Sequence, residues 1–240
     1  MFAEVTLIGV LHNKPANLKP GHYGISTVLM GTESDKLFSE KWFSTFDEKS
    51  TLLILESSSF CKEIIPNDHP KYEEEIKHVS PALFKSDFGP DILCADTRFK
   101  DRRSGKRVVE LYFKTLPYMN GTFGLKIMPE TFREAQERYL TGKWVNDYIV
   151  VKDIPFNIKN FITESDKIDK DMEQYMLAQA VKYSKEYEQI LIITGASHTL
   201  EMATTSGFPY ELLLEINDRK EIAQNYAMLL LRKANIIFNC

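Results

Sequence analysis

The sequence predicts an α/β fold, in which a central, mostly parallel β-sheet is flanked by helices. Two observations carry this prediction. Short, continuous apolar runs, typical of strands buried on both faces, recur along the chain. Between them lie segments whose apolar residues repeat at offsets of three and four, the spacing of one helix face. Regular alternation of the two patterns indicates parallel strands joined by helices.

Six segments are predicted as strands. The clearest is the run Gln-Ile-Leu-Ile-Ile-Thr near the C-terminal end of the chain. The weakest is Tyr-Ile-Val-Val, which is β-branched but equally fits the edge of a loop. In chain order the predicted strands are residues 5–11, 51–56, 91–96, 148–151, 189–194 and 211–216.

Three apolar stripes are predicted as helix faces that pack on the core. One is aromatic and precedes the second strand, and two contain Tyr, Met and Leu in the C-terminal third of the chain. Their members are Phe38, Trp42 and Phe46; Met172, Tyr175, Met176, Ala180, Tyr183 and Tyr187; and Ile222, Tyr226, Leu229 and Leu230. We interpret them as core faces, with no cofactor-binding pattern.

The composition is that of an ordinary globular protein. The 240 residues carry a net charge of −4, with 43% hydrophobic and 27% charged residues. We predict a single α/β domain over residues 1–240 with a helical insertion or lid at about residues 99–147. That stretch fits the strand–helix alternation least, because it holds a basic loop and two pattern-breaking glycines, Gly121 and Gly124.

The location and partners are predicted from charge, cysteines and apolar runs. Mild net acidity argues against general nucleic-acid binding. The three cysteines, Cys61, Cys94 and Cys240, are widely spaced and odd in number, as expected of reduced thiols. No apolar run is long enough to span a bilayer, and the N-terminus lacks a signal-peptide pattern. We therefore expect a cytoplasmic protein without a membrane partner.

The most informative motif occurs twice. Gly9-Val-Leu-His12 and Gly195-Ala-Ser-His198 both follow an apolar strand and both read G-x-x-H. The C-terminal ends of parallel strands meet at one edge of a sheet, where ligands bind. Glycine at that edge lets the chain turn sharply and lets a ligand approach the backbone. The two histidines are therefore predicted to meet, although they lie near opposite ends of the chain.

Two further strands end in ionisable residues. Glu56 follows one apolar run, and Asp96 ends another, with Arg98 two residues later. His12, Glu56 and His198 form a His₂Glu set, which suits a catalytic metal with one open position. Without a metal, the same set supplies an imidazole base oriented by a carboxylate. Two interpretations of Asp96 and Arg98 are open: Arg98 holds a substrate carboxylate or stabilises an oxyanion, or the two residues form a local ion pair.

Four short blocks together resemble the TraB/Tiki/ChaN/erythromycin-esterase superfamily. They are Gly9-x-x-His12, the Leu-Glu56 strand end, Ala95-Asp-Thr-Arg98 and Gly195-x-x-His198. The resemblance covers these blocks over roughly residues 5 to 200. It implies an α/β fold in which His12, Glu56 and His198 line one pocket. It also implies one of three activities: metal-dependent peptidase, metal-independent ester hydrolysis, or haem binding.

The function predicted from these observations is hydrolysis of a peptide or ester bond in a small-molecule or peptide substrate. Water would be activated by His12, Glu56 and His198, with Asp96 and Arg98 beside them. The predicted cofactor is a divalent metal, Mn²⁺, Co²⁺ or Zn²⁺, held by the same three residues. The alternative is a non-catalytic protein that binds haem, another ligand or a protein partner in the same pocket. The chain has no G-x-S-x-G, P-loop or G-x-G-x-x-G motif.

Overall fold

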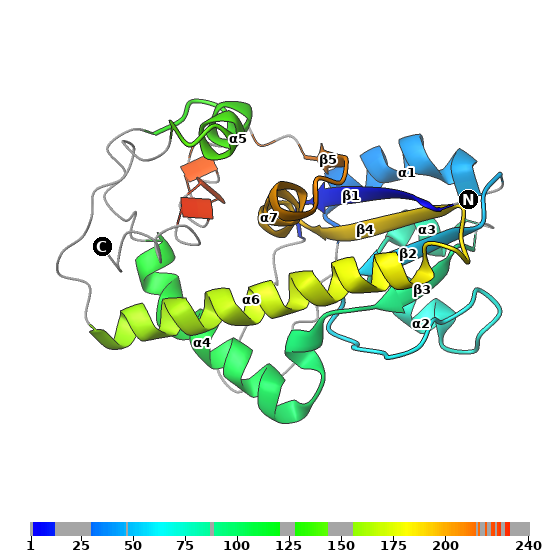
Figure 1. The fold of residues 1–240 in the computed structure, drawn as a ribbon, viewed down its shortest axis with the longest axis horizontal. Coiled ribbons are helices and arrows are strands. Elements are labelled where there is room, and N and C mark those ends of the chain that lie inside the picture. Colours follow the sequence, from blue (N-terminus) through cyan, green and yellow to red (C-terminus); the bar gives the residue numbers. More distant parts are fainter. Residues whose placement is uncertain are drawn as a thin grey trace. The chain divides into compact units, whose positions relative to one another are not determined.

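A computed structural model describes residues 2–12, 30–46, 48–86, 89–120, 128–143 and 156–214, together with single residues between 216 and 230. Strands and helices alternate along these segments (Figure 1). The elements are β1 (Glu4–Val10), α1 (Thr32–Phe46), β2 (Thr51–Leu55), α2 (Tyr72–Ile76), α3 (Pro81–Phe84), β3 (Asp91–Cys94), the 3₁₀ turn η1 (Thr97–Phe99), α4 (Arg102–Asn120), α5 (Phe132–Leu140), α6 (Phe156–Tyr183), β4 (Gln189–Gly195), α7 (Ala196–Ser206) and β5 (Tyr210–Leu213).

The described strands form one five-stranded sheet in the order β3-β2-β4-β1-β5, and every pairing in it is parallel. This confirms the predicted α/β fold. Five of the six predicted strands correspond to β1 to β5, and the sixth, residues 148–151, lies outside the described residues. The predicted ends of β3 and β5 are too late by two and three residues, because the last ladder pairs are at Cys94 and Leu213.

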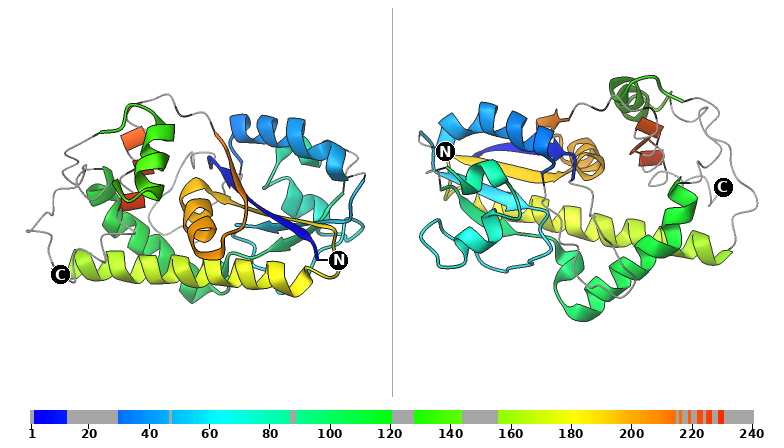
Figure 2. Two further views of the ribbon diagram at one scale, coloured as in Figure 1. Left: turned by 45° about the horizontal axis from the view of Figure 1, so that its top comes forward. Right: turned by 180° about the vertical axis from the view of Figure 1, so that it is seen from behind.

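The two faces of the sheet carry separate apolar cores, as strand alternation requires. Helices α1, α2 and α3 cover one face, and α7 and the C-terminal half of α6 cover the other. Both views in Figure 2 show α1 and α6 on opposite sides of the sheet. The first core includes Ile8, Val10, Leu53, Leu55, Phe38, Trp42 and Ile76, and the second includes Leu7, Leu52, Ile54, Met172, Met176 and Met202. Two predicted stripes therefore do pack on the sheet.

The chain divides into two compact units. The first contains Met1–Lys106 and Asp169–Leu214, and the second contains Arg107–Ile168 and Glu215–Cys240. The predicted insertion at residues 99–147 overlaps the second unit, and the single-domain prediction stays a prediction. Every residue of the candidate site belongs to the first unit.

Within the second unit, an ion-pair network joins α4 to α6. The guanidinium of Arg107 donates to both carboxylate oxygens of Glu164, with Nε 2.6 Å from Oε1, and also pairs with Glu110. Lys114 closes the network on Glu110. Part of the third predicted stripe is also seen in this unit, where Ile222, Tyr226, Leu229 and Leu230 are helical and buried.

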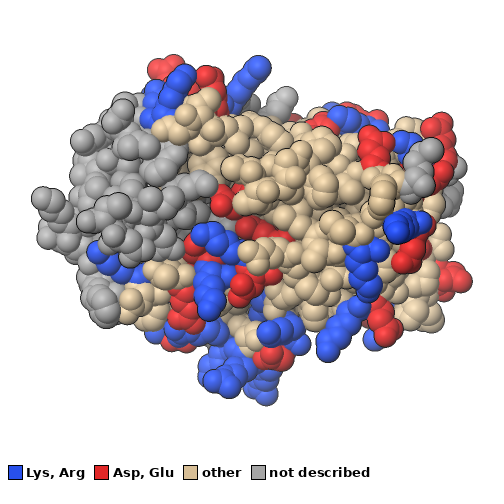
Figure 3. All heavy atoms as spheres, viewed as in Figure 1, with Lys and Arg blue, Asp and Glu red and all other residues tan. Residues whose placement is uncertain are grey.

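Charged side chains are interspersed on the surface. On the face shown in Figure 3, Lys and Arg alternate with Asp and Glu over the described residues. Such a mixture produces a weak long-range field. Among the helices that the structure describes, none is both long and apolar enough to cross a membrane.

Candidate active site

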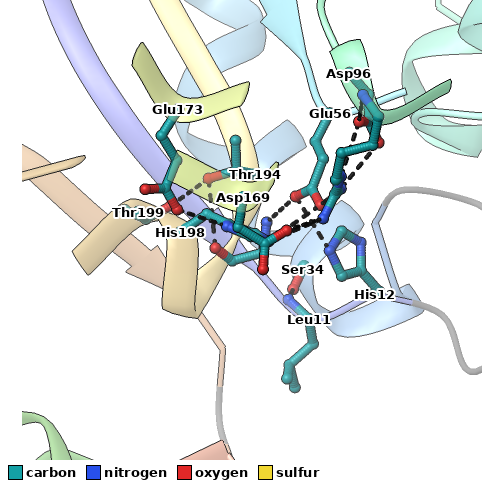
Figure 4. A network of polar contacts seen from close by, with 12 residues as sticks. Leu11, His12, Ser34, Glu56, Asp96, Asp169, Glu173, Thr194, His198 and Thr199 are labelled. Atoms are coloured by element: carbon teal, nitrogen blue, oxygen red, sulfur yellow. Dashed lines mark hydrogen bonds and ion pairs between the residues drawn. The ribbon is translucent and has the colours of Figure 1, made fainter. Parts of the chain in front are cut away.

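Four of the five strands deliver a candidate side chain to the C-terminal edge of the sheet. His12 lies two residues beyond β1, Glu56 directly follows β2, and Asp96 lies two residues beyond β3. His198 is in the first turn of α7, whose N-cap, Gly195, is also the last residue of β4. Figure 4 shows these side chains pointing toward one another. Parallel strands thus bring together residues from both ends of the chain.

Glu56 is the centre of the cluster. Its Oε2 accepts a hydrogen bond from the Gly195 amide at 2.8 Å and lies 3.4 Å from His12 Nε2. Its Oε1 accepts from Arg98 and lies 3.5 Å from His198 Nε2. The Glu56 side chain is 6% exposed, whereas that of His12 is 38% exposed. The structure therefore brings the predicted His12, Glu56 and His198 together, with His12 on the solvent side.

Arg98, in η1, donates from at least four of its five guanidinium N–H groups to protein partners. Nε and Nη2 donate to the two oxygens of Asp96 at 2.8 and 2.9 Å, and Nη2 also donates to Glu56. Nη1 donates to Asp169 at 2.9 Å and lies 3.4 Å from His198 Nε2. A guanidinium has five such donors. Arg98 therefore acts as a junction that positions the cluster, and this geometry does not favour the predicted contact with a substrate carboxylate or oxyanion.

Sequence reasoning missed two members of the cluster, Asp169 and Glu173, both in α6. His198 Nδ1 lies 2.7 Å from Glu173 Oε1, and both side chains are buried. A signal was present in the sequence, because the two acids stand four residues apart and flank Met172 of the predicted apolar stripe. A buried acid in line with a core face needs a partner. Neither residue stands at a strand end, so the strand-end argument did not reach them.

The glycines of the two G-x-x-H motifs lie so close to neighbouring side chains that a Cβ atom would displace those side chains. A Cβ atom on Gly195 would lie 2.6 Å from His12 Nε2, so the imidazole packs directly over the Gly195 backbone. A Cβ on Gly9 would lie 2.3 Å from Leu212 Cδ2 and 3.2 Å from the Cα atom of Ala196. The missing side chain of Gly9 thus lets β5 and α7 pack close to β1, whereas that of Gly195 lets the His12 imidazole pack on the backbone.

The electrostatics of the cluster are those of a buried network of opposite charges. Burial alone raises the pKa of Glu56, but His198, Arg98 and His12 together bring that pKa well below its ordinary value. Burial raises the pKa of Asp96, and Arg98 only partly opposes this shift. Burial lowers the pKa of Arg98, but Asp96 and Glu56 raise it well above its ordinary value. Glu56 and Arg98 are therefore held as a charged pair.

The donor types of the predicted metal site suit Zn²⁺, but their arrangement does not. The Arg98 guanidinium binds Glu56 Oε1 and lies 3.4 Å from His198 Nε2, so a cation already stands where the ion would bind. Within the described segments, no group of three or more His, Cys, Asp or Glu side chains is arranged to hold a metal ion. We therefore derive no step through a metal, and the metal prediction stays a prediction.

The chain was also compared with known proteins. No family model, curated protein or solved structure matches it. The resemblance to the TraB/Tiki/ChaN/erythromycin-esterase superfamily therefore stays a prediction, and the function must be argued from the site itself.

Proposed function

We propose that the protein is a hydrolase in which His12 activates water for attack on a peptide or ester bond. The observation that carries the proposal is the contact between His12 Nε2 and the buried carboxylate of Glu56. A carboxylate on one imidazole nitrogen fixes the tautomer and makes the other nitrogen the base. His12 is the more exposed of the two histidines, which supports its role as the group that meets water and substrate.

The other cluster residues hold the Glu56 carboxylate in place. Arg98 and the Gly195 amide each donate to one of its oxygens. Asp96, Asp169 and Glu173 in turn fix Arg98 and His198 by the hydrogen bonds described above. A base whose carboxylate partner is buried and held by several hydrogen bonds needs little reorganisation during reaction. We assign catalysis to His12 and positioning to Glu56, Asp96, Arg98 and His198.

The substrate class is proposed more broadly. A small molecule or a peptide is expected, because the site lies at the sheet edge where such ligands bind in α/β folds. We also propose a cytoplasmic location, which rests on the cysteine pattern; Cys61 and Cys94 are free thiols here.

A substrate screen tests the proposal. Purified protein is assayed on panels of peptides, carboxylic esters and phosphate esters, in parallel with His12→Ala and Glu56→Gln. His78→Ala is the matched control, because His78 is an exposed histidine of the same unit outside the cluster. We expect turnover of a peptide or ester by the wild type and by His78→Ala, and a loss of about 100- to 10,000-fold in the other two.

The same preparation tests the non-catalytic alternative. Haem is added to the protein, and the Soret region is recorded for the wild type and for His12→Ala. A Soret shift that is lost in His12→Ala, together with no turnover of any substrate in the panels, would contradict the hydrolase proposal and support haem binding.

A further inference from the structure

Cys61 and Cys94 are 33 positions apart in the sequence but meet at the edge of the sheet. The Cys94 amide donates to Cys61 Sγ at 3.2 Å, and the Cys61 amide donates to the Cys94 carbonyl at 3.1 Å. The Cys61 thiol in turn donates to the Cys94 carbonyl, with Sγ 3.7 Å from that oxygen. Cys61 Sγ therefore lies against the backbone of Cys94, and both residues are free thiols.

The backbone around the pair is firmly held. Residues 61–65 run antiparallel to the edge strand β3, where Ile65 and Ile92 exchange hydrogen bonds of 2.8 and 3.0 Å. On the other side, Ala95 donates to Leu55 at 2.9 Å. A single bridge on one side of β3 and the ladder with β2 on the other thus hold the backbone next to both cysteines. This preorganisation makes a bond between the sulfurs feasible without a large backbone movement.

The two thiols are not equivalent. Cys94 is fully buried and Cys61 is partly exposed, so a reagent in solution reaches Cys61 first. Hydrogen bonds from the Cys94 thiol and amide lower the pKa of Cys61, against burial, which raises it. The hydrogen-bonded neighbour Cys61, burial and the carboxylate of Glu75 raise the pKa of Cys94, whose thiol donates to Glu75 Oε2 at 3.8 Å. Cys61 is therefore the more acidic and the more accessible of the two thiols, and the thiolate is the nucleophilic form.

We propose that Cys61 and Cys94 are a redox-active dithiol that a peroxide converts to a disulfide. The Cys61 thiolate attacks the O–O bond, an S–O bond forms, and hydroxide leaves and takes up a proton, which gives Cys61 sulfenic acid. The Cys94 thiol then attacks that sulfur, an S–S bond forms, and the sulfenic oxygen leaves as water. The two thiols supply two electrons and two protons, and one peroxide is reduced to two waters when it is hydrogen peroxide. This chemistry is independent of the proposed hydrolase.

The test uses the whole chain in a Cys240→Ser background, so that only two thiols remain. Hydrogen peroxide is added, remaining thiols are blocked, and peptides are mapped by mass spectrometry. We expect one Cys61–Cys94 disulfide, reversed by dithiothreitol. In the Cys94→Ser variant, oxidation should stop at the sulfenic acid of Cys61, which dimedone traps. Cys61→Ser should leave Cys94 reduced, with a rate of oxidation at least about tenfold lower than that of Cys61.

Two results would overturn the proposal. One is that both thiols stay reduced at a peroxide dose that fully oxidises free glutathione. The other is that each cysteine is oxidised on its own to sulfinic acid, with no cross-linked peptide. Circular dichroism checks that the single variants are folded, and the peptide map of the Cys240→Ser protein decides the question by itself if they are not.

Discussion

Glu173 Oε1 lies 2.7 Å from His198 Nδ1, so helix α6 supplies the carboxylate that fixes the histidine at the end of β4. This contact means that His198 presents its other nitrogen, Nε2, toward Glu56 and Arg98. The orientation of one imidazole therefore depends on a residue 25 positions earlier, in a helix that packs on the same face of the sheet as α7.

Replacing Glu173 with Gln should lower kcat of the proposed hydrolase by about 10- to 100-fold and leave KM nearly unchanged. The amide keeps the shape of the side chain but removes the charge that holds His198. Steady-state kinetics measure this split. The exposed, uninvolved Glu74 of the same unit provides the control variant Glu74→Gln. An equal loss in both variants, or a rise in KM alone, would contradict a positioning role.

Arg98→Ala should lower the free energy of unfolding by about 3 to 5 kcal/mol, because three largely buried carboxylates lose their shared cation. Urea unfolding measures the change. Lys41→Ala is the control, since its ion pair with Glu211 lies at the surface and should be worth about 0 to 1 kcal/mol. Similar effects of the two substitutions would show that the Arg98 junction is not a structural centre.

Stability should fall on acidification through Glu56. The unfolded chain binds a proton on Glu56 near pH 4.5, and the folded chain only at lower pH. Between these two pKa values the unfolded state holds more protons than the folded state. The contribution of Glu56 to the free energy of unfolding is therefore present above this pH range and is lost as the pH falls through it. Urea unfolding from about pH 3 to pH 7 should give a flatter profile for Glu56→Gln than for the wild type.

Asp96 should affect the pH dependence of stability in the opposite direction to Glu56, because its pKa is raised in the folded chain. The contribution of Asp96 to the free energy of unfolding declines as the pH rises from its ordinary pKa to its raised pKa in the folded chain. Asp96→Asn should therefore lose stability more steeply on acidification than the wild type. Parallel profiles for the wild type and both variants would show that neither carboxylate is perturbed.

Gly195→Ala should displace His12, since the added Cβ would lie 2.6 Å from Nε2. We expect kcat to fall about 10- to 100-fold in a folded protein. Gly9→Ala is the comparison, because its Cβ meets Leu212 and no cluster residue. If His12 transmits the effect, adding His12→Ala to Gly195→Ala reduces activity no further than His12→Ala alone. If the activity losses of the two substitutions add in the double variant, Gly195→Ala acts through residues other than His12.

Removal of divalent metals should leave the proposed activity intact, because Arg98 already supplies the cation beside Glu56 and His198. Elemental analysis and assays before and after chelation with EDTA measure this. Activity that is lost on chelation and restored by Mn²⁺, Co²⁺ or Zn²⁺ would establish the metal site predicted from the residue types. Magnesium serves as the control ion, since imidazole ligands do not suit it.

The parts of the fold that follow from local pattern were predictable. Buried parallel strands have continuous apolar runs, and these identified β1 to β5. The meeting of His12, Glu56 and His198 was also predictable, because strand direction alone brings strand ends together. Asp169 and Glu173 were not found, since the way α6 packs on the sheet is a tertiary property. The contact of Cys61 with Cys94 likewise depends on the irregular segment beside β3, which has no sequence period.

The position of β1 has a consequence for how the protein is made. Its partners in the described sheet are β4 and β5, which begin at Gln189 and Tyr210. During synthesis, most of the chain must therefore be made before β1, whose last four residues are buried in the folded protein, can pair with either strand. Pairing across such sequence distances is slow and leaves strand edges open to aggregation. Refolding of the isolated protein should be slow for the same reason, and a chain interrupted before β4 would lack the histidine cluster altogether.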